Sequence, residues 1–328
     1  MEQSRVDVIR EIGLTAALLA LVLAPALSAG QAFWSKDTPK LPMARSWVAQ
    51  KAKLPPYTPR RTPDGVPDLQ GEWSGAGGDN NSFLEDHDYV DVTTPAQESF
   101  VSDPPDGKIP YTPWALAKRN EILAGLARGW PGESGQRLYT SPGSFCLTAA
   151  PVFSFDAQEI VQKPGSVIML TDDAYRVIPT DGRPAISQNA KFWLGSARGR
   201  WEGNTLVVEV TSLNGKGWFD STGQFYSENT RMVERWTLVD ANTIDYEVTV
   251  EDPTIYTRPW TMTFPKRRAG TGPSGPRGVS VASVLPPVNN DPYAKELWET
   301  ACYEGNNESL QSIHSLGYKW FTGVTPPK

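Results

Sequence analysis

Short segments in which apolar and polar residues alternate dominate the middle of this chain. The alternation is clearest in residues 243–251, where the apolar side chains fall on one parity: Ile244, Tyr246, Val248 and Val250. Successive side chains of a β-strand point to opposite faces, so this segment predicts a strand with one buried face. Further strands are predicted at 159–163, 166–171, 175–179, 191–201, 205–213, 230–239 and 257–265.

Short turns join these predicted strands. Gly203 and Asn204 suit a two-residue hairpin turn, and Asp240 to Asn242 suit a three-residue turn in which Asn242 takes a positive φ. Strands joined in chain order by such turns form an antiparallel meander. We therefore predict a mainly β fold, in which the meander closes into a barrel or forms a strongly curled sheet.

The first 32 residues differ from the rest of the chain. Arg5 and Arg10 precede the apolar run 12–27, and small residues such as Ser28 and Ala29 follow it. This order of charged, apolar and small residues is typical of a secretory signal peptide. The alternative is an anchoring helix, but a membrane-spanning helix needs about 20 apolar residues. We expect residues 1–32 to be a signal peptide and the protein to be periplasmic or secreted.

Proline divides the remaining chain. Residues 33–67 are rich in proline and predict an extended arm on the surface. Residues 68–328 are expected to form one domain. An inserted helix is predicted at 113–128, since Pro113 suits a first helical position. C-terminal helices are predicted at 291–305 and 308–316.

Composition excludes several classes of function. The formal net charge is −6, which does not favour nucleic acid or an anionic membrane as the main partner. The chain has two histidines and two cysteines, and it lacks the usual zinc-binding and nucleotide-binding motifs, so we expect no metal and no cofactor. Beyond the signal peptide, no apolar run is long enough to span a membrane.

The two cysteines are Cys146 and Cys302. In an exported protein such a pair is expected to form a disulfide, which would connect the C-terminal tail to the region before the sheet. The alternative is two buried free thiols.

An ionisable residue falls on the apolar face of a predicted strand. Within 230–239, Glu234 shares its parity with Met232, Trp236 and Leu238. The turn at 240–242 would set Trp236 opposite Tyr246 and Glu234 opposite Val248. On the last strand, Arg258 shares its parity with Trp260. A buried carboxylate and guanidinium must pair, bind a ligand or change their pKa values.

Three interpretations of Glu234 remain open. Glu234 and Arg258 could form a pair that braces the barrel. Glu234 could instead be a general acid or base beside a ligand-binding Arg258, with the Tyr246 hydroxyl as a partner. A register shifted by one residue would turn Glu234 outward.

Other polar residues are predicted at the barrel rim. Asp181 and Arg183 flank a turn, and Asp220 lies in a long loop. Each could contact a substrate, although a solvated turn is the simpler interpretation of the first pair. The acidic loop from Glu85 to Asp91 could bind a divalent cation, but it lacks the EF-hand spacing and suits a solvated loop.

Aromatic residues make up 10% of the chain, and Trp236 and Trp260 fall on inward strand faces. These rings could simply fill a large β core. A cavity lined by them would suit a hydrophobic or aromatic small molecule, whereas exposed rings would suit carbohydrate stacking.

Several motifs occur together in one order, namely GRWEGNTLVV at 199–208, VER at 233–235, YEVTVEDP at 246–253, YTRPWT at 256–261, TDGR at 180–183 and ACYEGN at 301–306. These motifs resemble those of a large family of exported bacterial proteins. Most members of that family are hypothetical proteins, so the resemblance implies little about activity. The family often has His where this chain has Tyr303, and Asp where it has Asn204.

The first strand resembles that of lipocalins, whose first strand carries a Gly-x-Trp motif, here Gly71-Glu72-Trp73. This resemblance implies a lipocalin-like barrel. It also implies that Trp73 closes one end and that an arginine packs on its ring, with Arg258 and Arg235 as candidates.

Together these features predict an exported enzyme that acts by cofactor-independent acid–base chemistry on a hydrophobic or aromatic small molecule in the barrel. A lyase, hydratase, isomerase or cyclase fits that chemistry. Glu234, Arg258 and Tyr246 would be catalytic, and the substrate-binding residues would be Trp236, Trp260, Asp181, Arg183 and Asp220. The alternatives are a carrier that binds the same ligand class without catalysis, and a surface-interaction module with a filled core.

Overall fold

The computed structural model describes residues 35–74, 83–90, 95–126, 139, 151, 158–171, 174–186, 189–220, 222–268, 315 and 321–327. The predicted signal peptide, both cysteines and nearly all of the predicted C-terminal helices lie outside these residues. In the part that is described, no helix is long and apolar enough to cross a membrane.

Ten strands and two helices make up this part of the chain. The strands are β1 (Gly71–Ser74), β2 (Val101–Asp103), β3 (Gln158–Lys163), β4 (Ser166–Leu170), β5 (Tyr175–Pro179), β6 (Ser196–Glu202), β7 (Thr205–Thr211), β8 (Arg231–Asp240), β9 (Thr243–Glu251) and β10 (Trp260–Arg268). The helices are α2 (Ala44–Lys51) and α3 (Pro113–Leu126).

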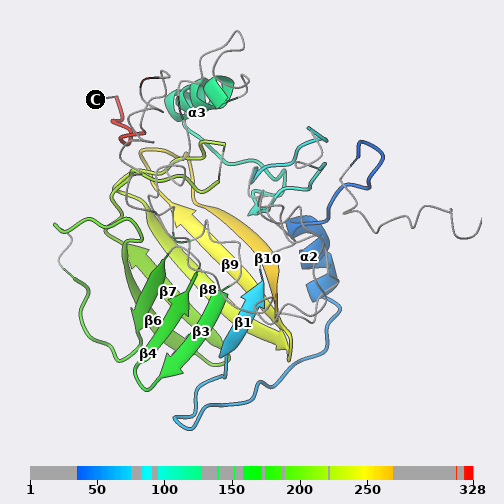
Figure 1. The fold of residues 1–328 in the computed structure, drawn as a ribbon, viewed down its shortest axis with the longest axis vertical. Helices are drawn as coiled ribbons and strands as arrows, with labels where there is room; N and C mark the ends of the chain where they lie inside the picture. The colour runs from blue at the N-terminus through cyan, green and yellow to red at the C-terminus, as the bar shows by residue number, and fades with distance from the viewer. Residues whose placement is uncertain are drawn as a thin grey trace, which may run out of the picture.

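All ten strands belong to one antiparallel sheet that is nearly closed into a barrel (Figure 1). The strand order is β5-β4-β3-β1-β10-β9-β8-β7-β6. The remaining strand, β2, lies off this path and pairs with the first residues of β10. The two edge strands, β5 and β6, lie close together without pairing. The predicted meander and mainly β fold are therefore confirmed.

The seam between β5 and β6 depends on a glycine. A Cβ atom on Gly199 of β6 would lie 2.9 Å from Cγ2 of Ile178 and 2.9 Å from Cγ2 of Thr180. Because such a contact is closer than side-chain atoms normally allow, Gly199 lets the end of β5 approach β6.

The pairing of β8 with β9 has the register that the turn predicted. Trp236 lies opposite Tyr246, and Glu234 lies opposite Val248. After a register irregularity between Leu238 and Asp240, Asp240 pairs with Thr243, so the turn has two residues rather than the predicted three, and the positive φ predicted for Asn242 was wrong. The inward face of β8 is therefore the one that carries Glu234.

The proline-rich arm is less extended than expected. It contains α2, whose residues lie in the longest proline-free stretch of the arm, between Pro42 and Pro55. The helix lies against the outside of β10 (Figure 1). Its Trp47 donates a hydrogen bond from Nε1 to Asp245 Oδ1 at 2.7 Å, and Lys51 pairs with the same carboxylate at 2.7 Å.

Trp73 is fully buried, and its Nε1 donates to the Leu69 carbonyl at 2.8 Å. The guanidinium that packs on its ring is that of Arg268, 4.3 Å from the ring centroid. The prediction that Arg258 or Arg235 packs on this ring was wrong. Arg235 points outward and pairs with Glu202 at 3.1 Å, and Arg258 lies outside β10.

Candidate functional site

A buried ion pair spans the barrel interior. Arg176 of β5 donates from Nη2 to Glu234 Oε1 at 2.6 Å and from Nη1 to Oε2 at 3.1 Å. The Glu234 side chain is 0% exposed and that of Arg176 is 7% exposed. The sequence therefore predicted the inward position of Glu234 correctly, and the structure supplies its partner.

Aromatic groups and a lysine surround this pair. Trp236 donates from Nε1 to Glu234 Oε2 at 3.1 Å. Nζ of the buried Lys266 lies 5.6 Å from the Trp236 ring centroid and 5.8 Å from that of Tyr246. We call Arg176, Glu234, Trp236, Tyr246 and Lys266 the core cluster.

Burial and charge set the protonation of two members of the core cluster. Burial raises the pKa of Tyr246 well above its usual value, and the adjacent Glu234 carboxylate adds to this shift. For Arg176, burial opposes the charged form, but the Glu234 carboxylate beside it raises the pKa overall. Tyr246 is therefore a neutral phenol at ordinary pH, and Arg176 is a cation.

The ion pair of the core cluster connects two strands across the interior of the barrel. The ion pair joins an edge strand, β5, to β8, two strands away from the opposite edge. Both oxygens of the Glu234 carboxylate accept hydrogen bonds from Arg176, and Oε2 also accepts one from Trp236. This arrangement matches the first of the three interpretations, a Glu–Arg pair inside the barrel, with Arg176 in place of Arg258.

The predicted inward position of Arg258 was wrong. Its side chain is 47% exposed and pairs with Asp103 at the surface. The next residue, Pro259, has no N–H to donate to a strand ladder, and β10 begins only at Trp260. Arg258 therefore precedes the strand, and the parity argument does not apply to it.

Asp220 was expected at a rim, but it is fully buried. Its Oδ1 accepts hydrogen bonds from the backbone N–H groups of Thr222 and Gln224, at 2.9 and 3.2 Å. Its Oδ2 accepts from the Thr222 hydroxyl at 2.9 Å and from Leu84 N–H at 3.2 Å. Burial raises the pKa of Asp220 to about 6, although these hydrogen bonds and the nearby Arg119 favour the charged form.

Residues from α3 and the preceding loop extend this arrangement. Arg119 donates from Nη2 to the Thr222 hydroxyl at 3.3 Å, and the Tyr111 hydroxyl donates to the Gln224 side-chain carbonyl. Within the described part of the chain, Arg119 Nε and Gln224 Nε2 are buried without a hydrogen-bond partner. We call Asp220, Thr222, Gln224, Arg119 and Tyr111 the loop network.

Trp236, Tyr246 and Trp260 belong to the core and are at most 2% exposed. Their rings pack on other rings: centroid distances are 4.4 Å for Trp236 with Tyr246 and 5.9 Å for Trp260 with Phe219. These rings therefore pack as the simpler interpretation expected.

Asp181 and Arg183 form an exposed pair within their turn, with 2.5 Å between Oδ2 and Nη2. Hydrogen bonds from the Arg183 side chain and backbone lower the pKa of Asp181 to about 2. The pair is solvated and is not brought near Glu234.

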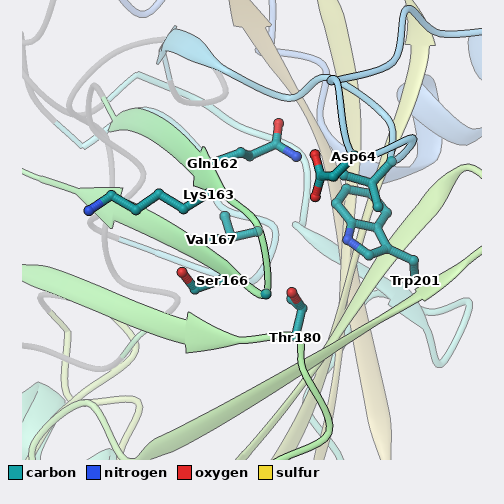
Figure 2. A pocket seen from close by; sticks show the side chains of 9 residues that line it. Asp64, Gln162, Lys163, Ser166, Val167, Thr180 and Trp201 are labelled. Atoms are coloured by element: carbon teal, nitrogen blue, oxygen red, sulfur yellow. The ribbon is translucent and has the colours of Figure 1, made fainter.

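A pocket of about 200 Å³ lies beside the seam, at one end of the barrel (Figure 2). Four segments meet there: the turn at 61–67 in the N-terminal arm, the β3–β4 hairpin, the end of β5 and the end of β6. Its lining residues are Asp64, Val66, Gln162, Lys163, Gly165, Ser166, Val167, Thr180 and Trp201. We call this the barrel-end pocket.

The polar groups of the barrel-end pocket differ in how far their hydrogen-bonding atoms are already used by described residues. Gln162 is occupied, since it accepts from Leu69 N–H at 2.6 Å and donates to the Pro67 carbonyl at 3.0 Å. Asp64 uses Oδ1 to accept from the Thr62 hydroxyl at 2.6 Å. In Figure 2 the Asp64 carboxylate lies beside the Trp201 indole, whereas the Lys163 ammonium points away.

A lysine forms ion pairs with the acidic loop that could have bound a cation. Lys40 Nζ lies 2.5 Å from Asp86 Oδ1 and 3.7 Å from Asp88 Oδ1. Asp91 lies outside the described residues. Among those that are described, no three His, Cys, Asp or Glu side chains gather in a way that could hold a metal ion.

No protein-family model matches this chain, and no curated protein matches it. The resemblance to a family of exported bacterial proteins therefore stays a prediction.

Proposed function

We propose that this chain is an exported protein that binds a small molecule in the barrel-end pocket without transforming it. One observation carries the proposal. The pocket opens to solvent between four segments, and several of its side chains have donor or acceptor atoms that bond to no described residue. Export is supported by the order of charged, apolar and small residues in 1–32.

The state of the buried carboxylates favours binding over catalysis. A general acid or base must reach the proton that it transfers. Both oxygens of Glu234 accept bonds from Arg176, and both oxygens of Asp220 accept bonds from neighbouring loop residues. Both oxygens of the buried Asp252 are likewise occupied, by Thr230 and Thr254. In this arrangement the three carboxylates stabilise the fold through hydrogen bonds within the protein.

The position of the pocket also suits a binding site. It lies at an end of the seam between β5 and β6, where the barrel is not held by backbone pairing. The arm closes over this end, and Arg61 of the arm donates to the Asn204 side chain in the β6–β7 turn at 3.0 Å. A ligand seated there would contact the arm and both edges of the sheet at once.

A second candidate is the acid–base enzyme, acting on a hydrophobic small molecule as a lyase or isomerase. The observation that favours it is the loop network. Its carboxyl group, Asp220, has a pKa of about 6, and the buried donors Arg119 Nε and Gln224 Nε2 have no partner among the described residues. A substrate carbonyl could accept from such donors while Asp220 exchanges a proton.

Native mass spectrometry of the protein purified from the exported fraction tests the first proposal. We expect a small molecule to remain bound to the natural protein and to be lost from Trp201→Ala. The matched control is Trp193→Ala, which removes another half-buried tryptophan, just before the opposite end of β6. A ligand that stays on the Trp201 variant contradicts the proposed site.

A further inference from the structure

We infer that the ligand of the barrel-end pocket is a neutral, polyhydroxylated ring of the size of one monosaccharide. This inference rests on the proposed binding function and assigns its ligand class. It is carried by the hydrogen-bonding groups, the charge and the volume of the pocket.

The free hydrogen-bonding groups require a ligand that both donates and accepts. Asp64 Oδ2 can only accept, and no described residue donates to it. Trp201 Nε1 can only donate, and no described residue accepts from it. The hydroxyl groups of Ser166 and Thr180 can do either. Ligand hydroxyl groups satisfy all of these partners, because each hydroxyl is both a donor and an acceptor.

The remaining surface of the pocket is apolar. The Trp201 indole lies at one side, and Val66 and Val167 contribute aliphatic surface. In Figure 2 the indole nitrogen faces the side of the pocket where Val167 and Thr180 lie. The indole therefore offers its N–H edge to the pocket, and the valines offer C–H surface against which the C–H groups of a sugar ring can pack. A ring with hydroxyls at its edge and C–H groups on its face matches this combination.

Charge and volume narrow the class further. The lining holds one formal anion, Asp64, whereas the ammonium of Lys163 points away from the pocket (Figure 2). A cationic ligand group would satisfy Asp64 but would leave the Trp201 N–H without an acceptor. The Asp64 carboxylate would repel an anionic group brought beside it. A volume of about 200 Å³ lies below the range of about 300 Å³ and more that is typical of drug-sized ligands. The pocket therefore suits one ring.

Isothermal titration of the full mature protein with a panel of probes tests this inference. The panel contains neutral hexoses and pentoses, the corresponding sugar acids, and uncharged phenols of similar size. We expect saturable binding of at least one neutral sugar, and binding at least about tenfold weaker for its sugar acid. Removal of a charged hydrogen-bond partner lowers affinity by about tenfold or more. The Asp64→Ala variant should therefore bind the sugar more weakly by that factor.

Two conservative variants guard against loss of the fold. Thr180→Val and Ser166→Ala remove a hydroxyl with little change of shape, and each should weaken sugar binding severalfold. The matched control is Asp106→Ala, since Asp106 is another exposed aspartate whose Oδ1 accepts a turn hydrogen bond. This control should leave the affinity unchanged.

The outcomes separate this inference from the function on which it rests. Binding of phenols but not sugars, if lost in Trp201→Ala, overturns the ligand class and leaves the binding site in place. Sugar binding that Asp64→Ala and Thr180→Val leave unchanged overturns the assignment of the ligand to this pocket. If no probe binds and the purified protein carries no ligand, both the ligand class and the proposed function are wrong.

Discussion

Arg176 of β5 holds both carboxylate oxygens of Glu234 of β8 across the interior of the barrel, at 2.6 and 3.1 Å. The strands that carry them are not neighbours in the sheet, and β5 borders the seam where backbone pairing stops. The ion pair therefore supplies a connection between the two sides of the barrel that the strand ladder does not.

Glu234→Gln is expected to destabilise the protein strongly. The change leaves the Arg176 guanidinium buried without its counter-charge, and loss of one partner of a buried ion pair costs about 3–5 kcal/mol. Urea unfolding measures the effect. The control is Glu209→Gln, which breaks an exposed pair with Arg231 and should cost about 0–1 kcal/mol. Equal effects of the two changes would contradict the bracing role.

A double replacement should recover much of that loss. Apolar residues of similar volume in place of both partners, Arg176→Met with Glu234→Leu, remove the uncompensated charge, and such swaps are often neutral or stabilising. The free energy of unfolding of the double variant should exceed that of Glu234→Gln. If the double variant is less stable than the single one, the polar pair contributes more than charge compensation.

Asp220 should give the stability of the protein a characteristic pH dependence. Its folded-state pKa of about 6 lies above the ordinary value of 3.8, so the folded state binds this proton more tightly than the unfolded state. The contribution to stability is fully present below about pH 4 and is lost as the pH rises through 6. Two pKa units correspond to about 3 kcal/mol.

Comparison of unfolding free energies at pH 4.5 and 7.5 checks this expectation. Asp220→Asn should reduce the loss of stability between these two values relative to the natural protein. Asp181→Asn is the control, because the pKa of Asp181 is about 2 and its titration lies below this window. An Asp220 variant with the same pH profile as the natural protein would show that Asp220 does not titrate here.

Arg268→Ala should cost about 1–2 kcal/mol, because it removes the guanidinium that packs on the Trp73 ring. The guanidinium lies 4.3 Å from the Trp73 ring centroid and donates to the Gln70 carbonyl at 3.0 Å, and a partly desolvated cation–π contact is worth about this much. Arg258→Ala removes an exposed arginine and should be close to neutral. Thermal unfolding of the two variants would contradict this account if their midpoints fell equally.

The sequence predicted the strands well because alternation is a local property. The bounds predicted for 175–179 and 243–251 are those of β5 and β9, and the turn at 240–242 predicted the register between β8 and β9. The helix expected from Pro113 begins there as α3. The burial of Glu234 followed from the same alternation.

The partner of Glu234 could not be predicted in this way. On β5, Tyr175 and Val177 are 69% and 51% exposed, whereas Arg176 points inward. The usual rule that apolar residues face the core would have assigned the opposite faces. The contact with β8 also depends on closure of the barrel, which brings together residues 58 positions apart in the chain.

The barrel-end pocket was missed for a related reason. Its residues come from the ends of strands and from a turn in the arm, and each of these segments alone resembles an ordinary surface turn. Trp201 belongs to the motif at 199–208, but the motif does not show which face of the strand borders an opening. The sequence contained the residues of the pocket and lacked any signal of their proximity.

NMR spectroscopy of the indole N–H groups tests the location of ligand binding most directly. During titration with a bound sugar, or with the molecule that co-purifies, we expect the Trp201 signal, assigned through Trp201→Phe, to shift saturably. The Trp236 signal, from the core cluster, should stay unchanged. A saturable shift of Trp236 with a constant Trp201 signal would place the ligand inside the barrel and contradict the account.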